Sequence, residues 1–133
     1  MNREQFIQHT SDEYGMEGGE YLWPKYPLFC VFRHPRNRKW FAIVMDVPKN
    51  KLGLVGTEPL DVVNLKCASI LIGSLRKEPG IFPAYHMSKA NWISVALDGS
   101  VPDEQIKMLL YMSYDATAPK NKRKVKGINP SKE

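Results

Sequence analysis

The sequence feature that most constrains the fold is a pair of apolar segments, residues 28–33 (LFCVFR) and 39–47 (KWFAIVMDV), separated by five residues. Both segments are rich in β-branched and aromatic residues, which favour strands. The residues between them, 34–38 (HPRNR), are polar and include turn formers. The pattern therefore predicts a β-hairpin with a basic tip. Because the two segments are apolar almost without interruption, we expect both of their faces to be at least partly covered.

The remaining elements surround this hairpin. A helix is predicted over 2–14, where Asn2 and Gln5 match a capping box, another over 68–77, and the clearest one after Pro102, with an apolar stripe at Ile106, Leu109, Leu110, Ser113 and Tyr114. Strands are predicted over 60–66, 81–85 and 91–97, with a further short strand at 52–55. The order predicts an α+β fold, a two-layer sandwich of α-β(3)-α-β(2)-α type, with helices packed on an antiparallel sheet.

The positive charge of the chain lies at one end. Lys and Arg number 19 against 14 Asp and Glu, a net charge of +5. Residues 118–133 hold six basic side chains and one acidic one, which leaves 13 basic and 13 acidic side chains in the first 117 residues. We therefore predict one domain over 1–117 and a disordered basic tail over 118–133, because the tail has too few apolar residues to offset its ordering entropy.

Several classes of protein are excluded by what the sequence lacks. No apolar run approaches the roughly 18 residues of a membrane span, and the polar start MNREQFIQHT is unlike a secretory signal. Cys30 and Cys67 are too few for a disulfide scaffold or a four-thiolate zinc site. The three histidines share no metal-ligand spacing, and the common catalytic motifs are missing. We expect a cytoplasmic, non-enzymatic protein with no cofactor, no metal and no membrane partner.

The thiols give little support to an enzyme. Cys30 lies in a predicted apolar strand, where a thiol is more often inert than nucleophilic. The start of a helix can lower the pKa of Cys67, but the sequence identifies no base beside it.

Residues 83–97 (PAYHMSKANWISVAL) and the following DGSVPDEQIKMLLYMSY resemble the MmcQ/YjbR-like family of small bacterial proteins. Lys39-Trp40-Phe41-Ala42 is similar to the G-K-x-F-A strand of that family, with Arg38 in place of the glycine. Ser88 and Asn91 also depart from its usual asparagine and histidine. The resemblance covers about residues 1–115. It implies a fold similar to that of secretion chaperones and a DNA-binding role through wing-like loops of the sheet.

Three basic regions are candidate DNA contacts. The hairpin tip carries Arg33, Arg36, Arg38 and Lys39, which could hold phosphates, while acidic residues such as Glu17 and Glu20 lie elsewhere in the sequence. The loop after the fourth strand offers Tyr85, His86 and Lys89 for stacking and phosphate contact. The tail contributes Lys120, Lys122, Arg123, Lys124 and Lys126 as a nonspecific polyanion binder.

Each region also has a plainer interpretation. The hairpin tip could be a solvated turn, the tail a solvated end, and the loop a simple connection with His86 and Trp92 in the core.

Three functional hypotheses stay open. The first hypothesis is a DNA-binding protein. The alternative is a protein-interaction module without a nucleic-acid role, suggested by the chaperone-like architecture and by the aromatic loop with Trp23 and Tyr26. A small-molecule site near Tyr85 and His86 is a third.

Overall fold

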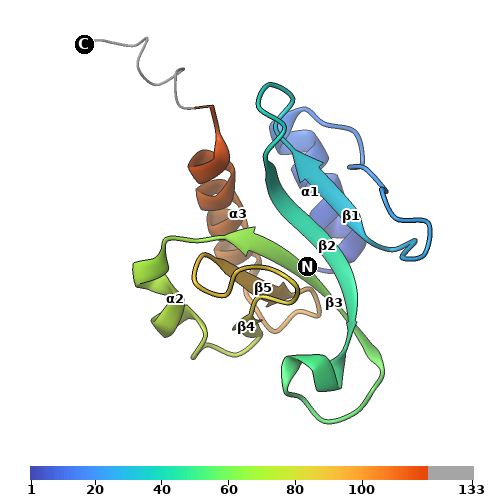
Figure 1. Cartoon of the computed structure of the whole chain (residues 1–133), viewed down its shortest axis with the longest axis vertical. Coiled ribbons are helices and arrows are strands. Elements are labelled where there is room, and N and C mark those ends of the chain that lie inside the picture. Colours follow the sequence, from blue (N-terminus) through green and yellow to red (C-terminus); the bar gives the residue numbers. More distant parts are fainter. Residues whose placement is uncertain (120–133) are drawn as a thin grey trace.

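The computed structural model describes residues 1–119. Its elements follow the order α1 (Arg3–Tyr14), β1 (Cys30–Arg33), β2 (Trp40–Pro48), the 3₁₀ helix η1 (Lys49–Leu52), β3 (Pro59–Lys66), α2 (Ser69–Leu75), β4 (Ile81–Pro83), β5 (Trp92–Ala96) and α3 (Asp103–Thr117) (Figure 1). The predicted α+β class and element order are confirmed.

Two predictions need comment. The short strand expected over 52–55 does not form, because η1 occupies 49–52 and the chain then turns at Gly53, whose φ is 80°. The disordered tail was predicted over 118–133. From residue 120 on, this tail lies outside the described residues, and with it the five basic residues named above.

The five strands form one antiparallel sheet in the order β1-β2-β3-β5-β4. Ala42 of β2 pairs with Leu65 of β3, and Leu65 pairs with Ile93 of β5. Phe32 and Pro83 occupy the same row in the two edge strands. The β1–β2 turn and the β4–β5 loop therefore begin at the same end of the sheet.

The two faces of the sheet are covered in different ways. Helices α1 and α3 pack on one face, where Phe6, Ile106 and Leu110 join the inward side chains of the strands (Figure 1). On the other face, a second core of Val31, Ile43, Met45, Val47, Leu52, Leu60, Val62 and Ala96 is covered by half-buried side chains from the 20–29 and 84–91 loops. The expectation that the hairpin is covered on both faces is confirmed.

Polar contacts fix both terminal helices. The predicted capping box is present, since the Asn2 side chain accepts from the Gln5 amide and the Gln5 side chain accepts from the Asn2 amide. At α3, the buried Ser113 hydroxyl donates to the Phe41 carbonyl oxygen over 2.6 Å and accepts from the Lys66 amide over 2.9 Å. One hydroxyl thus connects the helix to two neighbouring strands.

Tyr14, at the end of α1, is expected to make the fold less stable at alkaline pH. Its ring stacks on Tyr114 at 4.2 Å, and burial, with a smaller contribution from Glu13, raises the pKa of Tyr14 from 10.0 to about 12. The unfolded chain therefore releases this proton at lower pH than the folded chain. The stabilising contribution of neutral Tyr14 is complete below about pH 10 and is lost as the pH rises toward 12.

We expect the urea midpoint of the protein to fall between about pH 9 and about pH 11, and to fall less for Tyr14→Phe, which has no hydroxyl to ionise. An equal fall in both proteins would show that Tyr14 is not responsible.

Candidate functional site

The turn between β1 and β2 is held by the end of α3. His34 is buried, and its Nε2 lies 2.9 Å from the Tyr114 carbonyl oxygen and 3.0 Å from Thr117 Oγ1. Asn37 Nδ2 donates to the Thr117 carbonyl oxygen over 2.9 Å. His34 therefore fixes the tip in place, although it stands in the sequence among basic residues that are exposed.

Arg33 is part of an ion pair. Its guanidinium donates to both carboxylate oxygens of Glu20, with Nη2–Oε1 and Nε–Oε2 distances of 2.6 and 3.0 Å. The hydrogen bond from Arg33 lowers the pKa of Glu20, and the same bond raises the pKa of Arg33. The expectation that acidic residues lie away from the hairpin is wrong for Glu20. The start of the 20–29 loop pairs with β1 through an antiparallel bridge between Glu20 and Val31, and this pairing brings Glu20 next to the hairpin.

The other three basic residues of the tip are exposed. Arg36, Arg38 and Lys39 make no ion pair with any residue of the described part of the chain. Arg38 has a φ of 66°, in the left-handed region that costs an L-residue roughly 1–2 kcal/mol. Glycine adopts this conformation without that cost, which explains why a glycine suits this position in the motif that the segment resembles. Here an arginine occupies it.

Lys89 lies on a different part of the surface from the basic residues of the tip. It borders a hollow together with Lys51, Leu52 and Tyr85. Arg36 instead lines a hollow with Tyr114 and Pro119, and Arg38 one with Glu17 and Glu20. The candidate residues therefore form two groups, one at the tip and one at the 84–91 loop.

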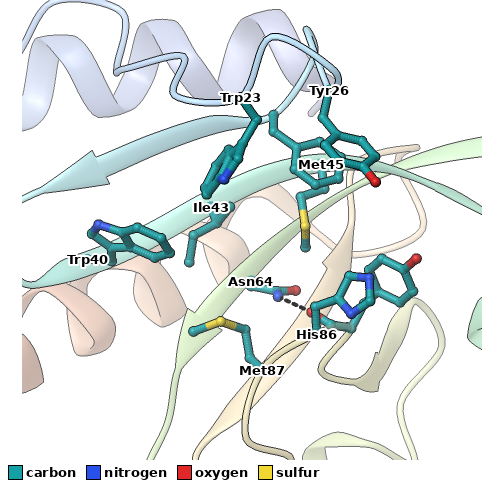
Figure 2. Close-up of a pocket in the computed structure, with 10 residues that line it drawn as sticks. Trp23, Tyr26, Trp40, Ile43, Met45, Asn64, His86 and Met87 are labelled. Atoms are coloured by element: carbon teal, nitrogen blue, oxygen red, sulfur yellow. Dashed lines mark hydrogen bonds between the residues drawn. The ribbon is translucent and has the colours of Figure 1, made fainter.

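An aromatic pocket of about 220 Å³ lies on the face of the sheet opposite α1 and α3. Three segments contribute to it: the 20–29 loop, the strands β2 and β3, and the 84–91 loop (Figure 2). The residues that line it are Trp23, Tyr26, Phe29, Trp40, Ile43, Met45, Asn64, Tyr85, His86 and Met87. We refer to this set as the aromatic pocket.

The sequence did not reveal this pocket as a unit. Trp23 and Tyr26 suggested a protein-interaction loop, and Tyr85 and His86 suggested a small-molecule site, but the two pairs lie about 60 residues apart in the chain. The signal that could have joined them is the spacing of Ile43 and Met45, which places both on the same face of β2. The expectation that His86 is in the core is wrong, because its side chain is exposed.

A buried hydrogen-bond network forms the floor of the pocket. Asn64 of β3 and Ser94 of β5 are cross-strand partners with no exposed surface. Ser94 Oγ donates to Asn64 Oδ1, Asn64 Nδ2 donates to the Tyr85 carbonyl oxygen over 2.8 Å, and the Tyr85 amide donates to Ser94 Oγ over 3.0 Å. This closed set of bonds fixes the start of the 84–91 loop to the sheet.

The thiols and the acidic residues give no further site. Cys30 and Cys67 are buried, and burial raises the pKa of both, including that of Cys67 at the start of α2. Within residues 1–119 there is no group of three or more His, Cys, Asp or Glu side chains that could hold a metal ion. None of the helices in this part of the chain is long and apolar enough to cross a membrane.

Comparisons with known proteins agree with the fold. The family model described as YjbR matches residues 18–116. The uncharacterised protein YyaQ of Bacillus subtilis is 38% identical over 88% of this chain and 98% of its own length, and the uncharacterised protein YjbR of Escherichia coli is 40% identical over 64% and 67%. A crystal structure from Pseudomonas syringae has a TM-score of 0.86 and 44% identity, covering 89% of this chain and all of that one. This chain belongs to the YjbR family.

Proposed function

We propose that this protein binds DNA in the cytoplasm and has no catalytic activity of its own. It contacts phosphates through Arg36, Arg38 and Lys39 of the β1–β2 tip, with Lys89 and the basic tail adding further contacts. The observation that carries this proposal is the backbone of Arg38, whose φ of 66° is unfavourable for an L-residue. A position that prefers glycine is occupied by an arginine on an exposed turn, and such retained strain is typical of functional sites.

The attachment of the tip supports the same function. His34 and Asn37 bind the end of α3, so the three cations project from a fixed turn rather than from a loose loop. Because little ordering entropy is then lost on binding, the tip is suited to hold phosphates, which arginine contacts through two parallel hydrogen bonds. The ion pair with Glu20 removes Arg33 from this set of contacts.

Neutralising the tip is expected to weaken DNA binding and its salt dependence. We expect Arg36→Gln/Arg38→Gly to lower the slope of log K against log salt by about 2, one unit for each lost phosphate contact. Glycine at position 38 also relieves the backbone strain, so the variant remains folded. The measurement is fluorescence anisotropy of a labelled duplex with the full chain across a salt series.

The matched control is Arg76→Gln/Lys77→Gln, which removes two charges at the end of α2, on the opposite side of the molecule from the tip (Figure 1). An equal loss in both variants would contradict a tip-specific contact. A protein ending at Pro119 should retain weak binding, and complete loss of binding on removal of the tail would contradict a DNA site in the folded part.

A protein-interaction module is the second candidate, favoured by a group of exposed apolar side chains in the 20–29 loop, namely Tyr21, Leu22, Tyr26 and Leu28. If the full chain binds no duplex DNA even at low salt, this candidate replaces the first.

A further inference from the structure

We propose that the aromatic pocket receives one unpaired nucleobase of single-stranded DNA. This inference rests on the proposed DNA binding and adds a contact that only a strand with unpaired bases can make. It assigns a role to the face of the sheet that the helices leave uncovered, and it concerns residues separate from the basic tip.

The arrangement of the rings suits a planar ligand. Figure 2 shows Trp23, Tyr26, Trp40 and His86 arranged around Met45 and Asn64. The Trp23 and Trp40 rings lie 5.7 Å apart and are perpendicular, with an interplanar angle of 89°. At this distance the two indoles contact each other edge to face and together form one side of the pocket. A flat group in the pocket can therefore stack against their exposed surface, but it does not pass between them.

The size of the pocket fits one base. Its volume of about 220 Å³ equals roughly seven water molecules at about 30 Å³ each. Pockets for drug-sized ligands span about 300–1,000 Å³. The aromatic pocket is therefore suited to a group of one or two rings.

The charges around the pocket identify the rest of the ligand. None of the ten described residues that line it carries a carboxylate. Lys25 lies between Trp23 and Tyr26 in the chain and is exposed. Lys89 and Lys51 border the hollow that shares Tyr85 with the pocket.

These cations favour an anionic ligand over a quaternary ammonium or an uncharged peptide side chain. A base in a nucleic-acid strand has a phosphate on each side, which fits an apolar pocket next to a hollow that is bordered by two lysines.

The polar groups of the floor indicate stacking without base selection. Both polar atoms of the Asn64 side chain already bond to Tyr85 and Ser94, so the floor offers few hydrogen bonds to a base edge. His86 has a φ of 60°, and its ring lies 4.0 Å from the Tyr85 ring, with both residues lining the pocket. We therefore expect similar affinity for strands of different base composition.

The experiment compares two single strands of equal length and charge, oligothymidylate and its abasic counterpart, with the full chain. Trp23 and Trp40 report binding in the pocket through their fluorescence. We expect oligothymidylate to bind about 5- to 150-fold more tightly than the abasic strand, as stacking of one base predicts, and to quench the tryptophan emission. Equal affinity for the two strands would overturn the inference.

Two variants test the pocket without disturbing the core. Tyr26→Ala and His86→Gly alter exposed side chains and should reduce the preference for oligothymidylate over the abasic strand. Tyr111→Ala, an equally exposed tyrosine on α3, is the matched control and should keep that preference. A preference that is unchanged in both pocket variants would overturn the inference.

The outcomes also separate this inference from the proposed function. Binding to duplex and abasic DNA that depends on Arg36 and Arg38, without any preference for bases, would overturn only the role of the pocket. An absence of binding to duplex, abasic and base-containing DNA would overturn both.

Discussion

Replacing Phe41 by alanine is expected to lower the free energy of unfolding by about 3–5 kcal/mol. Phe41 has no exposed surface and lies in the core between the sheet and the two long helices. Its ring centroid lies 4.9 Å from that of Tyr114, 5.1 Å from that of His34 and 5.9 Å from that of Tyr14. The truncation leaves a cavity where the β1–β2 turn, α1 and α3 meet, and these rigid elements cannot close it.

Urea unfolding followed by circular dichroism measures this change. Tyr111→Ala is the matched control, because Tyr111 is 58% exposed on α3 and its removal should change stability by less than about 0.5 kcal/mol. A loss of less than about 1 kcal/mol in Phe41→Ala would contradict the described packing.

Replacing Asn64 by alanine is expected to destabilise the protein by about 3 kcal/mol, since a buried acceptor left without a partner costs about 1–3 kcal/mol and several bonds are lost together. The substitution removes the donor to the Tyr85 carbonyl oxygen and the acceptor for Ser94 Oγ, both in the floor of the aromatic pocket. Hydrogen exchange of the 84–91 loop should increase as well, because this network fixes the loop to β3 and β5.

Asn50→Ala is the matched control for Asn64→Ala, since Asn50 is exposed in η1 and the change should be within about 0.5 kcal/mol. Asn64→Asp tests whether the side chain at position 64 donates a hydrogen bond to the Tyr85 carbonyl oxygen. Burial raises the pKa of such a carboxyl above its unfolded value, so its stability should be greatest at acidic pH and decrease as the pH rises above about 4. If Asn64→Asp is instead more stable at neutral pH, the Asn64 side chain does not donate to Tyr85.

The sequence predicted the fold where local patterns and packing agree. The hairpin segments are apolar on both faces, and both faces are covered. The stripe on the last helix is buried at Ile106, Leu109, Leu110 and Ser113. The short helix α2 shows the limit of such patterns.

The spacing of Ile70, Leu71 and Leu75 favours one apolar face of α2. In the structure, however, Ile70 is 88% exposed and Ile72 is the buried residue. Three consecutive apolar residues in a seven-residue helix satisfy more than one stripe, so periodicity cannot choose between them.

The sequence by itself determined the class of the fold, the order of its elements and the concentration of positive charge at the C-terminal end, because these depend on local composition and periodicity. The tertiary structure alone decided which charged or titratable residues are paired, buried or exposed. It paired Arg33 with Glu20, buried His34 against α3 and left Arg36 and Arg38 exposed. It also joined Trp23 to His86 in one pocket. Such contacts join residues that are far apart in the chain, and they depend on how the strands pair and where the loops fold back. No local sequence pattern encodes this information.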